Sequence, residues 1–281
     1  LDAALDGRRV VGAAVVLDVT TGEVLALASA PRYDVRSYTT DYPDLASNPD
    51  HPLTHRAVAG QYPLGSVFKA VVATAALHEG VITPDTFLRC DGVLDPSNTN
   101  RFKCHIFPHG HGDIRLRKAI KKSCNVFFYK LALEMSRDQR GRLDYARGIA
   151  RLAMWARRLG LGRATGIRLP GEATGSLDGI RHPANLAIGQ GRLKVTPIQA
   201  AQLYGLIATG GRMPKLTLVK KPHQSKPPRL ALDLNPRHMR VIRDAFDAVV
   251  NEQGGTGHST VYDPLTAIAG KTGTAQAGAG E

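Results

Sequence analysis

Several features that would assign this chain to a class of proteins are missing from its sequence. No apolar run approaches the roughly 18 residues of a membrane-spanning helix. There is no internal repeat. No signal peptide is present either, so we expect any targeting segment to have been removed or to lie outside the sequence. No recognised nucleic-acid-binding motif accompanies the net charge of +13, and the basic residues are spread along the chain. A charge of this sign favours contact with an anionic membrane surface or an acidic polymer.

Cysteine is also scarce, and its three residues fall within 35 positions, at Cys90, Cys104 and Cys124. With His111 they form the pattern C-x13-C-x6-H-x12-C. Three thiolates and one imidazole suit a closed tetrahedral zinc site, although the spacing lacks the close C-x-x-C pairs of most zinc motifs. A disulfide between the first two cysteines, with the third free, is the alternative. The alternative histidine ligands are His105 and His109.

The composition is that of a globular protein, with 43% hydrophobic and 22% charged residues in 281, enough for one large or two small domains. Residues 11–30 predict a hairpin that turns at residues 20–22. Residues 31–60 and 83–112 are expected to be irregular. Helical patterns cover Ile114–Met135, Leu143–Leu159, Pro197–Thr209 and Pro236–Asn251. A tight turn is predicted at residues 188–191, and strands are predicted at Lys215–Val219 and Leu265–Gln276. A linker rich in proline and lysine is predicted after the first of these strands, up to Pro228. Helices around an antiparallel sheet indicate an α+β domain.

The most informative stretch is Tyr-Pro-Leu-Gly-Ser-Val-Phe-Lys, at residues 62–69, which precedes an apolar run. The Pro-Leu-Gly break predicts a buried helix that starts at Ser66 and ends near Gly80. Residues i and i+3 share a helix face, so the Lys69 amine can reach the Ser66 hydroxyl. Serine needs an adjacent base to act as a nucleophile, and burial lowers the pKa of a lysine, so this pair suits nucleophilic catalysis. A capping serine beside a solvated lysine is the alternative interpretation.

Two further motifs follow in order, Ser123-x-Asn125 and Lys271-Thr272-Gly273. Each is common alone, but together with S-x-x-K they are the motif set of penicillin-binding proteins and class A β-lactamases. Along most of its length the chain is similar to the transpeptidase domain of class B penicillin-binding proteins. The longer stretches that carry this resemblance include Ser-Cys-Asn-Val-Phe-Phe-Tyr, Leu-Pro-Gly-Glu-Ala-Thr-Gly, Ile-Gly-Gln-Gly and Gly-Lys-Thr-Gly-Thr-Ala-Gln.

The resemblance implies a penicillin-binding-protein fold, in which an antiparallel sheet is flanked by helices, and a serine D-Ala-D-Ala transpeptidase activity. Ser66 would attack the stem-peptide carbonyl to form an acyl-enzyme, with Lys69 as its base. Ser123 would pass a proton to the leaving D-alanine, and Asn125 would hold Lys69 and the substrate amide. The rest of the implied catalytic set is Lys271, Thr272, Gly273 and Thr274, in which Lys271 attracts the terminal carboxylate and the Thr274 N–H joins that of Ser66 in an oxyanion hole.

Within this family the cysteine pattern is most similar to that of elongation-type members, some of which carry a metal at these positions. The resemblance therefore implies structural zinc held by Cys90, Cys104, His111 and Cys124, and no organic cofactor. Because Cys124 lies between Ser123 and Asn125, the metal would brace the second motif.

Other activities share the same acylation chemistry. A D,D-carboxypeptidase or β-lactamase is one alternative, and a β-lactam sensor or scaffold domain that does not cross-link is another. Class A β-lactamases activate water with a glutamate. In that family it lies in an E-x-x-L-N loop, which this chain lacks. Glu172 lies instead in Pro-Gly-Glu-Ala-Thr-Gly, which favours a transpeptidase.

The resemblance also implies a cellular setting. The expected partners are peptidoglycan stem peptides, β-lactams and an elongation-complex glycosyltransferase, with no nucleic acid. The expected location is the periplasmic face of the bacterial inner membrane. We expect residues 1–281 to form one transpeptidase domain that lacks the membrane anchor, the pedestal domain and the last two strands. An open apolar sheet edge is a liability, so we expect impaired activity and stability.

Overall fold

The computed structural model describes residues 10–220 and 229–275. Its contacts divide the chain into two compact units. The hairpin unit comprises Leu1–Tyr62, Gly160–Gly175 and Lys194–Ala231, and the helical unit comprises Pro63–Leu159, Ser176–Leu193 and Leu232–Glu281. Antiparallel strand pairs and helices make up the described part, which confirms the predicted α+β class. No helix in that part is both long and apolar enough to cross a membrane. The single incomplete domain expected over residues 1–281 stays a prediction.

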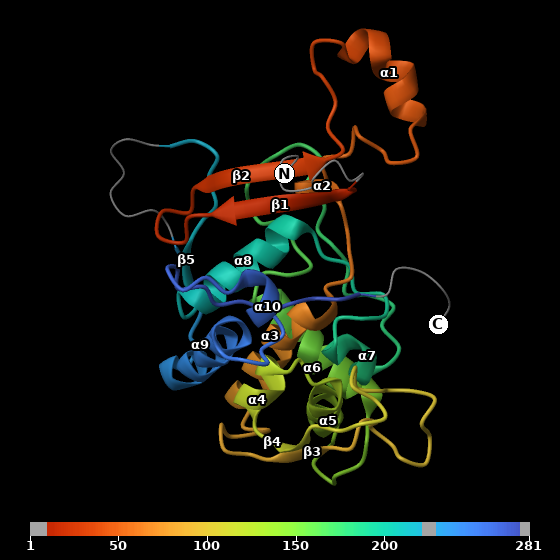
Figure 1. Ribbon diagram of the computed structural model, residues 1–281, viewed down its shortest axis with the longest axis vertical. Helices are drawn as coiled ribbons and strands as arrows, with labels where there is room; N and C mark the ends of the chain where they lie inside the picture. Colours follow the sequence, from red (N-terminus) through yellow and green to blue (C-terminus); the bar gives the residue numbers. More distant parts are fainter. Residues whose placement is uncertain (1–9, 221–228, 276–281) are drawn as a thin grey trace. The chain divides into compact units, whose positions relative to one another are not determined.

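The hairpin unit takes its name from β1 (Gly12–Leu17) and β2 (Val24–Ala30), which pair antiparallel (Figure 1). The Asp18 carboxylate accepts hydrogen bonds from the N–H and the hydroxyl of Thr20, at 2.7 and 2.6 Å, and so stabilises the turn. The hairpin predicted at residues 11–30 is therefore confirmed.

Helix α8 (Pro197–Ala208) packs against β1, and it confirms the helix predicted from Pro197. It begins with a capping box in which Thr196 and Gln199 each accept a hydrogen bond from the other's backbone N–H. The Gln199 amide also donates to the carbonyls of Arg163 and Thr174, both at 2.7 Å. These two hydrogen bonds join the segment that contains Arg163 and Thr174 to the start of α8.

Two predictions for the hairpin unit are wrong. Residues 31–60 are not one loop, because they contain α1 (Tyr38–Ser47) and α2 (Arg56–Ala59); α1 tolerates an internal proline and has no buried residue. The strand expected at Lys215–Val219 is displaced, because β5 (Arg212–Pro214) pairs with β6 (Arg229–Ala231). Part of the linker predicted up to residue 228 lies outside the described residues.

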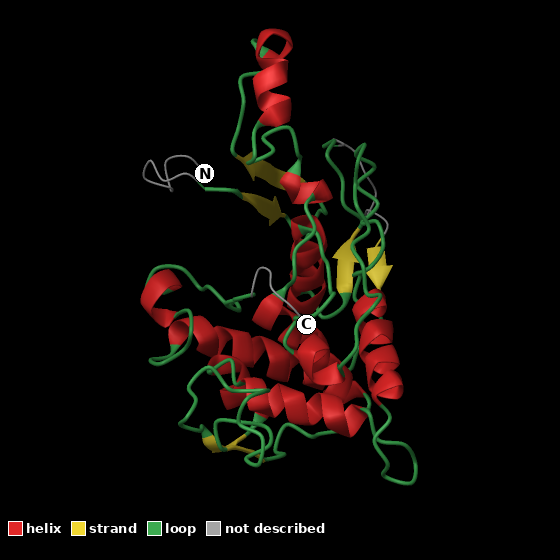
Figure 2. Ribbon diagram, turned by 90° about the vertical axis from the view of Figure 1, so that its right-hand side faces the viewer, coloured by secondary structure: helices red, strands yellow, loops and turns green. Residues whose placement is uncertain are grey.

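The helical unit is built around α3 (Lys69–His78), in which every residue from Lys69 to Leu77 is buried. A 3-10 turn, η2 (Gly65–Phe68), leads into it and carries Ser66. Around α3 pack α5 (Asn125–Met135), α6 (Tyr145–Arg158) and α9 (Pro236–Asn251). The buried helix is confirmed, although its α-helical part begins at Lys69, and α6 and α9 confirm two further predicted helices. The described strands form separate two-stranded pairs, which Figure 2 shows in yellow.

The helix expected over Ile114–Met135 is broken. Its first residue ends β4 (Gly112–Ile114), and α4 (Leu116–Lys121) then stops before Ser123, whose φ of +49° no α-helix accommodates. The predicted pattern had the right periodicity, but it gave no sign of this backbone reversal.

The strand expected over Leu265–Gln276 is not present at the residues up to 275, and Gln276 lies outside the described residues. The chain passes from α10 (His258–Val261) into an irregular segment that contains Lys271. A strand needs a hydrogen-bonded neighbour, and no described segment pairs with this one. The sequence also gave no indication of α7 (Pro183–Ala187), which immediately precedes the predicted turn at residues 188–191.

We expect Glu79→Ala to destabilise the protein by about 2 kcal/mol. The Glu79 carboxylate accepts from the Trp155 indole and the Arg151 guanidinium, both at 2.6 Å, and its removal leaves the indole N–H buried and unpaired. Urea unfolding measures the loss. The control is Glu134→Ala, which breaks an exposed pair with Arg137 and should cost less than about 0.5 kcal/mol. Equal losses in the two variants would contradict the assignment.

Candidate active site and metal centre

The side chain of Lys69 is completely buried and surrounded by uncharged oxygen atoms. Its amine donates to the Ser123 carbonyl and to Asn125 Oδ1, both at 2.7 Å, and lies 3.1 Å from Ser123 Oγ. Burial lowers the pKa of Lys69 to about 7, and the positive charge of Lys271 contributes to the shift. A lysine with this pKa is partly deprotonated near neutral pH, whereas an exposed lysine stays protonated.

The Ser123 hydroxyl lies between two lysine amines. Lys271 Nζ donates to Ser123 Oγ at 2.8 Å and to the Thr272 carbonyl at 3.0 Å. Burial also lowers the pKa of Lys271, to about 8. Because a hydroxyl both donates and accepts, Ser123 can carry a proton to or from Lys69 while it remains bonded to Lys271.

Asn125, the first residue of α5, is oriented from both ends of its amide. Its oxygen faces Lys69, and its Nδ2 donates to the Lys103 carbonyl at 3.2 Å. The Tyr129 hydroxyl donates to the same carbonyl at 3.4 Å. Sequence reasoning missed Lys103 and Tyr129. The i,i+4 spacing of Asn125 and Tyr129, which places both on one face of α5, was the available signal.

Ser66 lies on η2, one turn before Lys69. No hydrogen bond joins its hydroxyl to Lys69 among the described residues, because the Lys69 amine faces Ser123 and Asn125. The segment that contains Lys271 passes against the same turn. A Cβ added at Gly273 would lie 2.7 Å from Val67 Cγ2. The predicted catalytic residues are thus gathered in one unit, and their roles stay predictions.

The three cysteines and His111 come from four places in the helical unit. Strand β3 (Leu88–Cys90) pairs with β4, with Cys90 opposite Gly112, which brings Cys90 beside His111. The Cys104 N–H donates to the Gly92 carbonyl at 2.8 Å. Cys124 is the N-cap of α5, where its sulfur accepts from the Phe127 N–H at 3.5 Å.

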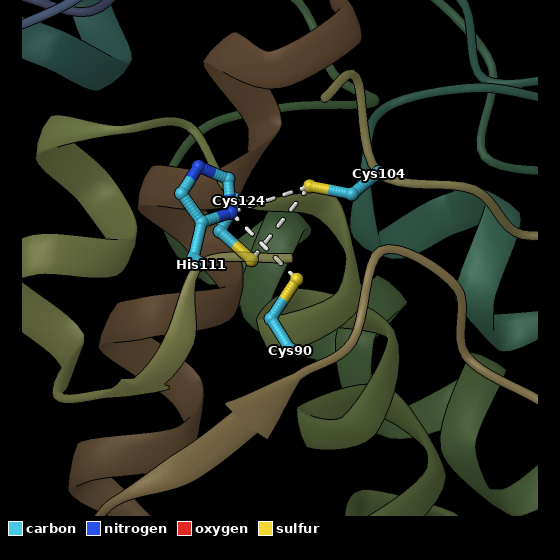
Figure 3. Close-up of side chains that lie close together, drawn as sticks. All are labelled: Cys90, Cys104, His111 and Cys124. Carbon is cyan, nitrogen blue, oxygen red and sulfur yellow. Dashed lines mark hydrogen bonds between the residues drawn. The ribbon is translucent and has the colours of Figure 1, made fainter. Parts of the chain in front are cut away.

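The four side chains converge on one point (Figure 3). His111 Nδ1 lies 3.6 Å from both Cys90 Sγ and Cys104 Sγ, and Cys104 Sγ lies 3.9 Å from Cys124 Sγ. All the donor atoms lie within 4.8 Å of one another. Zinc–ligand bonds of about 2.0–2.3 Å give tetrahedral edges of about 3.5–3.8 Å. The donor set and its spacing therefore fit zinc.

The alternatives weighed from the sequence fit less well. All three cysteines are free, so Cys90 and Cys104 form no disulfide. His105 Nδ1 lies 3.9 Å from Cys104 Sγ, but the compact donor group contains His111 and neither His105 nor His109.

Comparison with known proteins shows which family the chain matches. Residues 12–281 match the family model described as the penicillin binding protein transpeptidase domain. The peptidoglycan D,D-transpeptidase MrdA of Acinetobacter baumannii is 33% identical over 97% of this chain, which spans only 42% of that relative.

Two solved structures have the same fold. PBP2 of Pseudomonas aeruginosa in complex with WCK 5153 has a TM-score of 0.82 and 31% identity, over 98% of this chain and 64% of that one. PBP2 of Helicobacter pylori in complex with MreC has a TM-score of 0.82 and 28% identity, over 98% of this chain and 52% of that one.

We expect the Lys69 amine to titrate near pH 7, and we expect Lys271→Met to raise its pKa because a neighbouring positive charge is removed. The ¹³C shift of labelled lysine Cε, followed against pH and assigned with Lys69→Arg, measures both values. Lys130→Met is the control, since the Lys130 amine donates to the Arg89 carbonyl outside this cluster. A Lys69 pKa near that of an ordinary lysine, about 10.4, would contradict the expectation.

Proposed function

The chain belongs to the penicillin-binding protein transpeptidase family, and from this premise we propose that it cross-links peptidoglycan through an acyl-enzyme on Ser66. One observation carries the proposal: a serine hydroxyl lies between two buried lysine amines, at 3.1 and 2.8 Å, close to the nucleophile's helix. The lowered pKa of Lys69 lets a neutral amine serve as the base near neutral pH.

The first half-reaction is acylation. Ser66 Oγ attacks the carbonyl carbon of the penultimate D-alanine, and its proton passes to Lys69. The N–H groups of Ser66 and Thr274 stabilise the oxyanion; one such donor is typically worth about 10²- to 10³-fold in rate. The C–N bond then breaks, and the leaving D-alanine takes a proton from Lys69 through the Ser123 hydroxyl. Lys271 attracts the terminal carboxylate of the substrate.

The second half-reaction transfers the acyl group. An amine from a neighbouring stem peptide attacks the ester carbon and loses a proton through the same Ser123 and Lys69 pair. Ser66 leaves with a proton, which restores the free enzyme. Water activation by Glu172 is disfavoured, because its Oε1 accepts from the N–H and the hydroxyl of Thr165, both at 2.6 Å.

We place this activity in cell elongation, at the periplasmic face of the bacterial inner membrane. The curated relatives named MrdA and the solved PBP2 proteins support that setting. A partner of the MreC type is supported by the complex of the Helicobacter pylori protein. An elongation-complex glycosyltransferase remains the other partner that we propose.

Intact mass after incubation with a penicillin, followed by peptide mapping, tests the proposal. We expect one stable adduct on Ser66, its loss in Ser66→Ala, and its retention in the control Ser97→Ala. Transfer from a D-Ala-D-Ala peptide to an amine acceptor should follow. An adduct that disappears within seconds would indicate a hydrolase, and a stable adduct without transfer would indicate a sensor or scaffold.

We also propose that Cys90, Cys104, His111 and Cys124 bind structural zinc. The support is the donor chemistry and the distances of 3.6–3.9 Å between neighbouring donors. Bound zinc would keep the thiolates deprotonated and tie the loop around Cys104 to the start of α5. Because Cys124 lies between Ser123 and Asn125, bound zinc would also brace the second motif.

We expect the purified protein to contain one equivalent of zinc by elemental analysis. His111→Ala should weaken zinc binding and lower the acylation rate by roughly tenfold or more. His109→Ala is the matched control, which should keep both the metal and the rate. Full zinc retention in His111→Ala, or unchanged acylation after removal of the metal, would contradict this proposal.

A further inference from the structure

The residue immediately before the nucleophile lies between two other backbone segments without room for a side chain. Gly65 has φ of +56°, and its N–H donates to the Gly189 carbonyl at 3.0 Å. A Cβ added at Gly65 would lie 2.3 Å from the Thr274 carbonyl oxygen. A Cβ added at Gly189, where φ is +68°, would lie 2.1 Å from the Gly65 carbonyl oxygen and 2.7 Å from its nitrogen.

We infer that Gly189 is a positioning residue for Ser66, an inference that rests on the function proposed above. The backbone of the Gly189 turn contacts Gly65 directly. The position of this turn therefore determines the position of Ser66, the residue that follows Gly65. Because backbone atoms meet backbone atoms, no side-chain rotation can absorb a displacement.

The Gly189 turn is fixed to α7, which packs against the helix that carries Asn125. Its N–H donates to the Leu186 carbonyl at 2.8 Å, and the Gln190 N–H donates to the Asn185 carbonyl at 2.9 Å. Both acceptors lie on α7, which packs against α5 and α6. Since α5 begins at Asn125, the turn sets the nucleophile relative to the partners of Lys69.

The segment that contains Lys271 also packs against η2. A Cβ at Gly273 would lie 3.2 Å from the Leu64 carbonyl oxygen, which shows how closely this segment approaches the turn. Ser66 directly follows Gly65, and the Thr274 carbonyl lies against the Cβ position of Gly65, so Gly65 contacts both residues whose N–H groups are the proposed oxyanion donors. Displacement of Gly65 would therefore change both the attacking atom and the oxyanion hole, and a shift of about 1 Å can cost about 10²-fold in rate.

The competing explanation is that Gly189 is needed only for the conformation of its own turn, because a positive φ by itself favours glycine. Gly80 separates the two explanations. It also has φ of +68°, it lies in the same unit, and a Cβ there would meet nothing within 4 Å. Gly80→Ala therefore introduces the same backbone strain without contact with the nucleophile.

The test compares the wild type with Gly189→Ala and Gly80→Ala by stopped-flow acylation with a fluorescent penicillin. We expect the limiting acylation rate of Gly189→Ala to fall by about 10²-fold, with its non-covalent dissociation constant within about threefold of wild type. Gly80→Ala should stay within about twofold on both. Equal rates in the two variants, or a loss confined to the dissociation constant, would overturn the inference.

If Gly189→Ala does not fold, two helix-cap variants replace it. His182 caps α7 by accepting from the Ala184 N–H, and Asp144 caps α6 by accepting from the Arg147 N–H. His182→Ala should lower the limiting rate several-fold more than Asp144→Ala, and equal rates would overturn the inference. A wild-type protein that forms no Ser66 adduct would instead refute the proposed function, and the inference with it.

Discussion

A buried lysine whose hydrogen-bond partners are all uncharged oxygen atoms is the constraint on which the helical unit depends. Removing an ammonium from water costs several kcal/mol unless other dipoles replace its hydration. For Lys69 these are the Ser123 carbonyl, the Ser123 hydroxyl and the Asn125 amide oxygen. None of them carries the negative charge that would fix the proton on the amine. The pKa therefore falls to about 7, and α3 can contain an ionisable group in the middle of an otherwise apolar core.

The connection between α4 and α5 is shaped by this requirement. Ser123 adopts φ of +49°, a conformation that costs a non-glycine residue about 1–3 kcal/mol. Its neighbours compensate, because the Cys124 N–H donates to the Ala119 carbonyl at 2.9 Å and the Cys124 sulfur caps α5. One turn thus presents two oxygen atoms to Lys69 and a sulfur atom to the cysteine cluster. A single peptide bond therefore separates Ser123, a proposed catalytic residue, from Cys124, a proposed zinc ligand.

The sequence predicted those parts of the molecule that local patterns encode. The motifs that contain Ser66, Ser123 and Lys271 could be found because each is short, and the helix at Pro197 because it follows a predicted tight turn. Other features depend on contacts that no local pattern records. The strand expected at Lys271 needed a partner to pair with, and the break at Ser123 follows from tertiary contacts rather than from periodicity. Glycine contacts such as that of Gly189 join residues far apart in the chain and involve no side chain.

The cysteine cluster has a consequence for the redox chemistry of the protein. Its sulfur atoms are buried, and those of Cys104 and Cys124 lie only 3.9 Å apart. In an oxidising compartment such as the periplasm, two such thiols without a metal are close enough to be oxidised to a disulfide. That bond would draw the Cys124 sulfur away from the Phe127 N–H and disturb the first turn of α5, which begins at Asn125. Metal binding would therefore also protect Asn125, a proposed catalytic residue, from oxidative displacement.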